Sequence, residues 1–225
     1  MMDSINNLAD LLETINDLYI LLDNEIDFDA AGWPIFRKEH FLNEWPDDVV
    51  AYANRKNKLI TDRNKTLVCH FSSDIQNYRR FSKVMDDIAE YREYLGTVFP
   101  DITVTKDMDI EMQVLILLAN QLYAAVLAVN DIKLVANTRC GLKQTQKYLC
   151  HIPRNVIWAS GFLGCDKTSQ FSETAEYTNK ILRLMPSKLI IYGKQDPAVN
   201  SQLDILGINY RYYEDFHQRC KKEAM

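Results

Sequence analysis

The apolar residues between Ser4 and Asp23 recur at steps of three and four positions. This spacing places them on one side of an α-helix, and Ser4 or Asp3 is available to cap its first turn. A lone amphipathic helix is not stable in water, so we expect a second copy of the chain to cover this side in a two-fold homodimer. The alternative is that the helix closes one end of an incomplete barrel. The apolar stripe consists of Ile5, Leu8, Leu11, Leu12, Ile15, Leu18, Tyr19 and Leu22.

The remainder of residues 1–65 has the character of an irregular connector. Pro34 and Pro46 each follow a tryptophan, and the residue before a proline disfavours helical backbone. A short helix is expected over Asp47 to Asn57. The basic residues between Arg55 and Lys65 are typical of a solvated surface segment. We therefore predict a mostly helical N-terminal segment over residues 1–65.

From Thr66 onward, short β-rich runs alternate with longer helical patterns. This alternation is the signature of β-α-β units, which build a parallel sheet. We predict one α/β domain over residues 66–225, with a sheet of about five to six strands and crossover helices. An open doubly wound sheet and a partial β/α barrel both fit the alternation. The predicted strands are Leu67 to Phe71, Thr97 to Phe99, Lys133 to Ala136, Val156 to Ser160, Lys188 to Tyr192 and Ile208 to Tyr213, and the helices between the first five are Asp74 to Leu95, Asp109 to Val129, Lys143 to Cys150 and Ser172 to Leu184.

Composition narrows the function classes. The formal net charge of −5 disfavours binding to duplex DNA, because neutralising phosphates supplies most of that affinity. No uninterrupted apolar run reaches the roughly 18 to 20 residues that cross a bilayer, and the first residues lack a signal-peptide pattern. Five cysteines at irregular spacing indicate reduced thiols rather than disulfides or a zinc site. These features favour a cytoplasmic protein.

Five short segments occur in the order and spacing of one known family. In them the chain resembles the Domain of Unknown Function 4417 family, encoded mainly by phages, plasmids and integrated elements of Gram-positive bacteria. The resemblance covers about Leu67 to Phe216 and implies a fold and a genetic context, but no activity. The matching segments begin near the end of the first predicted strand and continue through Phe99-Pro100-Asp101, Lys106-Asp107-Met108, Ile152-Pro153-Arg154-Asn155 and Ile190-Ile191-Tyr192-Gly193-Lys194.

Polar residues follow most of the predicted strands, and the carboxyl ends of parallel strands meet at one edge of a sheet. Asp74 and Asp101 could act as a carboxylate pair in acid/base or magnesium chemistry, although Asp74 is also well placed to cap a helix. Arg139 and Lys194 could bind an anion or form salt bridges to Asp101 or Glu214. The ligand-binding candidates are Asn137, Arg139, Ser160, Gly161, Gly164, Asp166, Lys167 and Lys194.

The turn from Ser160 to Thr168 carries Gly161 and Gly164, and such glycines let backbone N–H groups approach an anion. The turn lacks the spacing of a phosphate-binding P-loop, so a tight strand-to-helix turn is the competing interpretation.

Three functions remain open: a protein that binds an anionic, nucleotide-like ligand at the strand ends, an interaction protein that binds a host or anti-phage defence protein, and a metal-dependent phosphoesterase. The sequence leaves the cofactor unknown and shows no zinc-ligand spacing.

Overall fold

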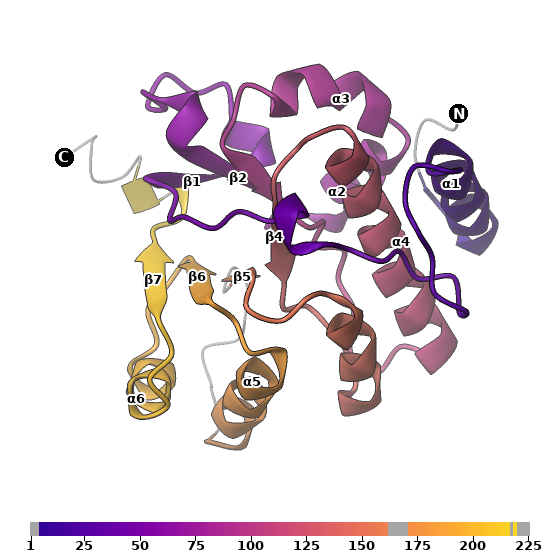
Figure 1. Ribbon diagram of the computed structural model, residues 1–225. Coiled ribbons are helices and arrows are strands. Elements are labelled where there is room, and N and C mark those ends of the chain that lie inside the picture. Colours follow the sequence, from indigo (N-terminus) through magenta and orange to yellow (C-terminus); the bar gives the residue numbers. More distant parts are fainter. Residues whose placement is uncertain (1–4, 162–170, 217, 220–225) are drawn as a thin grey trace.

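The computed structural model describes residues 5–161, 171–216, 218 and 219 (Figure 1). Its centre is a single parallel sheet of seven strands whose order in space is their order in the sequence. The strands are β1 (Asp48–Ala51), β2 (Thr66–Cys69), β3 (Gly96–Val98), β4 (Leu134–Asn137), β5 (Ile157–Gly161), β6 (Lys188–Tyr192) and β7 (Tyr210–Tyr213). The helices are α1 (Leu8–Leu21), α2 (Asp74–Phe81), α3 (Val84–Tyr91), α4 (Ile110–Val129), α5 (Phe171–Leu184) and α6 (Pro197–Ile205).

Sequential strand order makes every crossover move in the same direction, so the sheet curls into a nearly closed barrel. A doubly wound sheet would reverse its order at one point, and this one does not. The partial β/α barrel is therefore the correct alternative. The first and last strands approach each other through side chains: Tyr213 Oη donates to the carbonyl of Pro46 at 2.7 Å, and Arg219 Nη1 lies 2.5 Å from Asp48 Oδ1.

The alternation of side chains along each strand separates two cores. One fills the inside of the barrel, and its buried members come mainly from β1 to β6. The other lies between the sheet and the surrounding helices and contains Val68 of β2, Trp158 of β5 and most of α4. The inner core consists of Leu42, Val49, Ala51, Leu67, Cys69, Phe71, Val98, Val135, Ile157, Ala159, Ile190 and Tyr192.

The sheet has seven strands rather than the five to six expected, because the expected helix over Asp47 to Asn57 instead contains a strand. In this segment β1 pairs with β2 in register from Asp48 with Thr66 to Ala51 with Cys69, and the 3₁₀ helix η2 (Tyr52–Asn54) follows it. The sheet thus begins inside the segment predicted to be helical. Each of the six predicted strand runs overlaps an observed strand, with ends that differ by no more than two residues.

Two of the predicted helices also differ in form. The pattern from Asp74 to Leu95 forms two helices, α2 and α3, which are separated at Ser82 and Lys83. The pattern from Lys143 to Cys150 forms a 3₁₀ helix, η4 (Lys143–His151). Shorter 3₁₀ helices occur at η1 (Lys38–His40) and η3 (Arg63–Lys65).

The N-terminal helix packs against its own chain. Figure 1 shows α1 beside α4, outside the barrel, and Leu11, Ile15 and Leu18 of α1 are buried. Its N-cap is Asn7, whose Oδ1 accepts the N–H of Asp10 at 3.0 Å, rather than Ser4 or Asp3. Leu42 covers the amino end of the barrel instead, with its N–H bonded to the carbonyl of Leu134 at 2.9 Å.

The apolar side chains of α1 that remain exposed are Leu8, Leu12 and Ile20. The surface that the predicted homodimer would use is therefore narrower than the whole stripe.

Helix α4 forms the largest part of the outer core. Its 20 residues are long and apolar enough to cross a membrane, but 72 % of its most apolar window is buried inside the protein. Such a helix is typical of the core of a soluble protein, since a core helix is apolar on all sides.

Candidate functional site

The carboxyl ends of the strands surround a cleft with a volume of about 760 Å³. Its wall comes from the segments that follow β1, β2, β3, β4 and β7, together with the last residues of β5 and β6. Active sites of β/α barrels lie at this end, because the loops that follow the strands converge there. The cleft is therefore the candidate functional site.

Asp101, Asn137 and Arg139 form one hydrogen-bonded cluster in this wall. Arg139 Nε donates to Asp101 Oδ1 at 2.8 Å and Arg139 Nη2 donates to Oδ2 at 2.7 Å, so the salt bridge is bidentate. Asn137 Nδ2 donates to the same Oδ1 at 2.8 Å. Asp101 is buried, whereas the Arg139 side chain keeps 30 % of its surface exposed. The cluster fixes the direction of an arginine at the edge of the cleft.

The sequence prediction missed Asn77, which supports this cluster from α2. Its Nδ2 donates to the carbonyl of Asp101 at 3.1 Å and to the carbonyl of His70 at 3.2 Å, so it ties the ends of β2 and β3 together. Asn77 is buried one helical turn before Phe81 on the same side of the helix. A polar residue at a buried position of an amphipathic helix is the signal that identifies it.

Aromatic side chains form the base of the cleft. The rings of Phe71 and Tyr192 lie 5.8 Å apart with planes 24° from parallel, and Phe216 lines the cleft beside them. The Tyr192 hydroxyl accepts the N–H of Phe216 at 3.2 Å, and burial raises the pKa of Tyr192. Gly161 is required because a Cβ there would lie 2.5 Å from the Phe71 ring. Its role is thus close packing inside the barrel.

The other predicted site residues occupy different places. Asp74 Oδ1 accepts the N–H of Thr103 at 2.9 Å, so it holds the chain after β3, and it is not among the residues that line the cleft. Ser160 is buried outside the barrel, where its hydroxyl bonds with Thr138 and accepts from Tyr177. Lys194 is exposed and does not line the cleft. Gly164, Asp166 and Lys167 lie outside the described residues.

A buried histidine lies behind the site on the outer side of β2. His70 Nε2 lies 3.1 Å from Tyr91 Oη and 3.3 Å from Thr97 Oγ1, and Tyr91 Oη lies 3.2 Å from Tyr123 Oη. Burial, assisted by the charges of Arg80 and Arg55, lowers the pKa of His70 to about 3. The imidazole is therefore neutral in the folded protein across the physiological pH range.

His70 should make stability depend on pH. The unfolded histidine has a pKa near ~6.5, so below that value the unfolded state binds a proton that the native state refuses. The free energy of unfolding should fall by about 1.4 kcal/mol for each pH unit from ~6.5 toward 4. Urea unfolding of the wild type and of His70→Gln at pH 7.5, 5.5 and 4.5 measures this contribution. Between pH 7.5 and 4.5 the free energy of unfolding should fall further in the wild type than in His70→Gln. An equal fall in both proteins would contradict the prediction.

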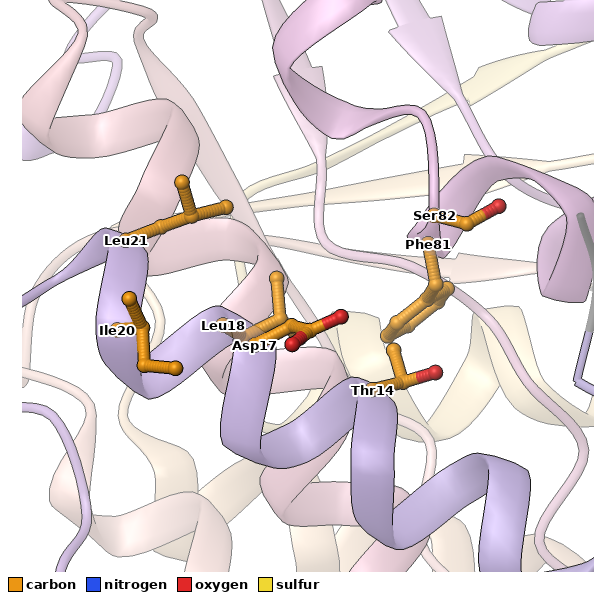
Figure 2. A pocket seen from close by; sticks show the side chains of 7 residues that line it. All are labelled: Thr14, Asp17, Leu18, Ile20, Leu21, Phe81 and Ser82. Carbon is orange, nitrogen blue, oxygen red and sulfur yellow. The ribbon is translucent and has the colours of Figure 1, made fainter. Parts of the chain in front are cut away.

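A second hollow lies away from the strand ends. It has a volume of about 220 Å³ and lies between α1 and the junction of α2 and α3. Figure 2 shows Leu18, Asp17 and Thr14 of α1 facing Phe81 and Ser82 across it. Asp17 is the one charged residue in its lining, so the hollow offers little for polar recognition.

Within residues 5–161, 171–216, 218 and 219, no group of three or more histidine, cysteine, aspartate or glutamate side chains is positioned to hold a metal ion. The carboxylates of Asp74 and Asp101 each accept hydrogen bonds from protein donors.

Comparison with known proteins assigns the family. The model of a domain of unknown function, DUF4417, matches residues 29–212, which include all of the sheet except the last residue of β7 and leave α1 outside. No curated protein and no solved structure matches the chain. The family match covers most of the chain, from the connector after α1 to the last strand, and the chain belongs to the DUF4417 family.

Proposed function

We propose that this protein binds an anionic, nucleotide-like ligand in the cleft at the carboxyl ends of its strands. The observation that supports this most directly is the composition of the cleft, which combines an aromatic base with an oriented polar wall. Ligand sites generally have an apolar lining and a few fixed polar groups. Phe71 and Tyr192 supply the first, and Asp101 with Arg139 supplies the second.

The size of the cleft suits a ligand of this class. At about 760 Å³ it lies within the roughly 300 to 1,000 Å³ typical of small-molecule sites. Ser72, Ser73 and Gln76 add hydroxyl and amide groups along one side, and these can bond with the edges of a base or with a sugar. We further propose a cytoplasmic protein, as the apolar pattern of the sequence favours, encoded by a phage or another mobile element, as the family resemblance implies.

The alternative is an interaction protein that binds a host or anti-phage defence protein. A different observation favours it: the neighbouring ends of α5 and α6 expose four large apolar side chains, and Figure 1 shows these helices side by side. Exposed apolar patches mark interfaces when they are contiguous. The side chains are Leu182, Met185, Ile205 and Leu206, with Ile205 exposed to 80 %. A metal-dependent phosphoesterase has weaker support, because Asp101 lines the cleft without Asp74 and both carboxylates accept hydrogen bonds from protein donors.

A bulky side chain in the cleft tests the proposal. Ser73 lines the cleft, is exposed, and makes no side-chain cap bond to α2, so Ser73→Trp should fill space at little cost in stability. The matched control is Ser201→Trp on the exposed side of α6. Native mass spectrometry first identifies any ligand that copurifies, and calorimetry then measures the affinity for the 5′-mono- and diphosphates of the four ribonucleosides.

The wild type and Ser201→Trp should bind one of these nucleotides, and Ser73→Trp should weaken its binding by about tenfold or more. Equal affinity in all three proteins would place the ligand elsewhere. If no small molecule binds and a protein partner is captured through the α5–α6 patch, the alternative function is correct.

A further inference from the structure

A smaller hollow adjoins the cleft on the side of β1 and α2. It has a volume of about 200 Å³, and Ala53, Ser72 and Gln76 line both spaces. The remaining wall of the hollow is basic, because Arg55, Arg79 and Arg80 line it. A ligand in the cleft can therefore extend into a neighbouring space of different chemical character.

The ion pairs around this hollow leave an excess of positive charge. Arg55 Nη2 lies 2.7 Å from Glu90 Oε2, and Lys56 Nζ lies 3.3 Å from Glu90 Oε1, so these two cations share one carboxylate. Arg80 pairs with Asp87. Arg79, which is exposed, forms no salt bridge with any residue in the described part of the chain. Four cations thus meet two carboxylates.

Two of these arginines are held in place by Tyr52. Its ring lies between the guanidinium groups, with Arg55 Cζ 3.6 Å and Arg80 Cζ 3.8 Å from the ring centroid. The Tyr52 hydroxyl donates to Asp87 Oδ1 at 2.9 Å, and burial raises its pKa to about 12, which keeps that hydroxyl protonated. Stacked, paired arginines lose little freedom when a ligand arrives, so the basic wall is preorganised.

The same arginines carry donors whose bonding is incomplete. The Nε atoms of Arg55 and Arg80 are both buried and bond to no acceptor among the residues that the structure describes. These Nε atoms are shielded from the hollow, so a ligand would contact the accessible parts of the two side chains, which keep 16 % and 18 % of their surface exposed. Phosphate fits best, because it carries up to two negative charges and three acceptor oxygens, which match the forked guanidinium group.

We propose that this hollow holds a phosphate group of the ligand that occupies the cleft, with Arg79 as its principal contact and the Arg55–Tyr52–Arg80 stack as its support. This inference rests on the proposed function and adds to it the position and the chemistry of the charged end. The sequence-based candidates for that role were Arg139 and Lys194; Arg139 has its charge balanced by Asp101, and Lys194 does not line the cleft.

The test compares Arg79→Gln with Arg154→Gln, which removes the same charge from an exposed position before β5, at the amino end of the barrel. Calorimetry measures the affinity of each variant for the 5′-monophosphates of the four ribonucleosides, for the four nucleosides and for inorganic pyrophosphate. Arg79→Gln should weaken nucleotide binding by about tenfold or more and leave nucleoside binding unchanged, whereas Arg154→Gln should alter neither.

The possible failures are distinguishable. If nucleosides bind the wild type as tightly as nucleotides do, the phosphate site is wrong and the cleft proposal stands. Equal weakening by Arg79→Gln and Arg154→Gln would reduce the effect to overall charge and would overturn the site. If neither nucleosides nor nucleotides bind, the proposal of a nucleotide-like ligand in the cleft fails, and pyrophosphate alone tests the phosphate site. Pyrophosphate binding that Arg79→Gln weakens supports the site, and no pyrophosphate binding refutes it.

Discussion

Leu18→Ala is expected to lower the free energy of unfolding by about 2 to 5 kcal/mol, the usual cost of removing a buried leucine side chain. Leu18 retains 1 % of its surface exposed where α1 packs on α4, so truncation leaves a cavity between the two helices. Leu12→Ala is the matched control in the same helix. Leu12 is 47 % exposed, and its loss should change stability by about 0.5 kcal/mol or less.

Urea unfolding of both variants measures this difference. Equal effects at Leu12 and Leu18 would contradict the packing of α1 against its own chain. Introducing a charge on α1 tests association separately from folding, because Leu8, Leu12 and Ile20 lie on the exposed side of the helix. If the proposed homodimer uses that side, Leu12→Asp should give a folded monomer in light scattering, whereas Leu18→Asp should prevent folding.

The second large effect is expected at Asp101. Asp101→Asn removes the charge that pairs with Arg139 while keeping the shape of the side chain, and it should cost about 3 kcal/mol of folding stability, the lower end of the range for breaking a buried ion pair. The lower end applies because Arg139 keeps 30 % of its side-chain surface exposed. Lys194→Gln, at an exposed position predicted for the same site, should change stability by about 0.5 kcal/mol or less.

A double-mutant cycle identifies the source of this effect. Arg139→Gln alone leaves Asp101 buried without its partner, so the combined variant should lose about 1 to 3 kcal/mol less than the sum of the two single losses. Strict additivity in denaturant unfolding would mean that the two side chains act independently, contrary to their bidentate contact.

Hydrophobic periodicity predicted most of the sheet but not its closure. The predicted runs between Leu67 and Tyr213 all overlap strands, because buried parallel strands are short, apolar and bounded by turns. β1 was missed since its four residues occur in a segment with a helical pattern, and pairing with β2 decides their conformation. Alternation alone cannot reveal strand order, so it could not separate the curled sheet from a doubly wound one.

The candidate site was predicted in part for a similar reason. Asp101, Asn137 and Arg139 converge because they follow neighbouring strands, β3 and β4. Ser160 also ends a strand, but it comes directly after Ala159, which points into the barrel, and successive side chains face opposite ways. The contribution of Tyr52 and the arginines beside it depends on contacts between distant segments, which one sequence does not encode as a local pattern.

The contact between β1 and β7 has a consequence for access to the cleft. Among the described strands these two each have one backbone partner, and side chains such as Tyr213 and Arg219 connect them. Ala51 and Phe216 line the cleft from opposite sides of this seam. In the described part of the chain, side-chain contacts rather than a backbone ladder join the two edges beside the cleft, so separating these edges would break no strand ladder, whereas opening a fully closed barrel would break one.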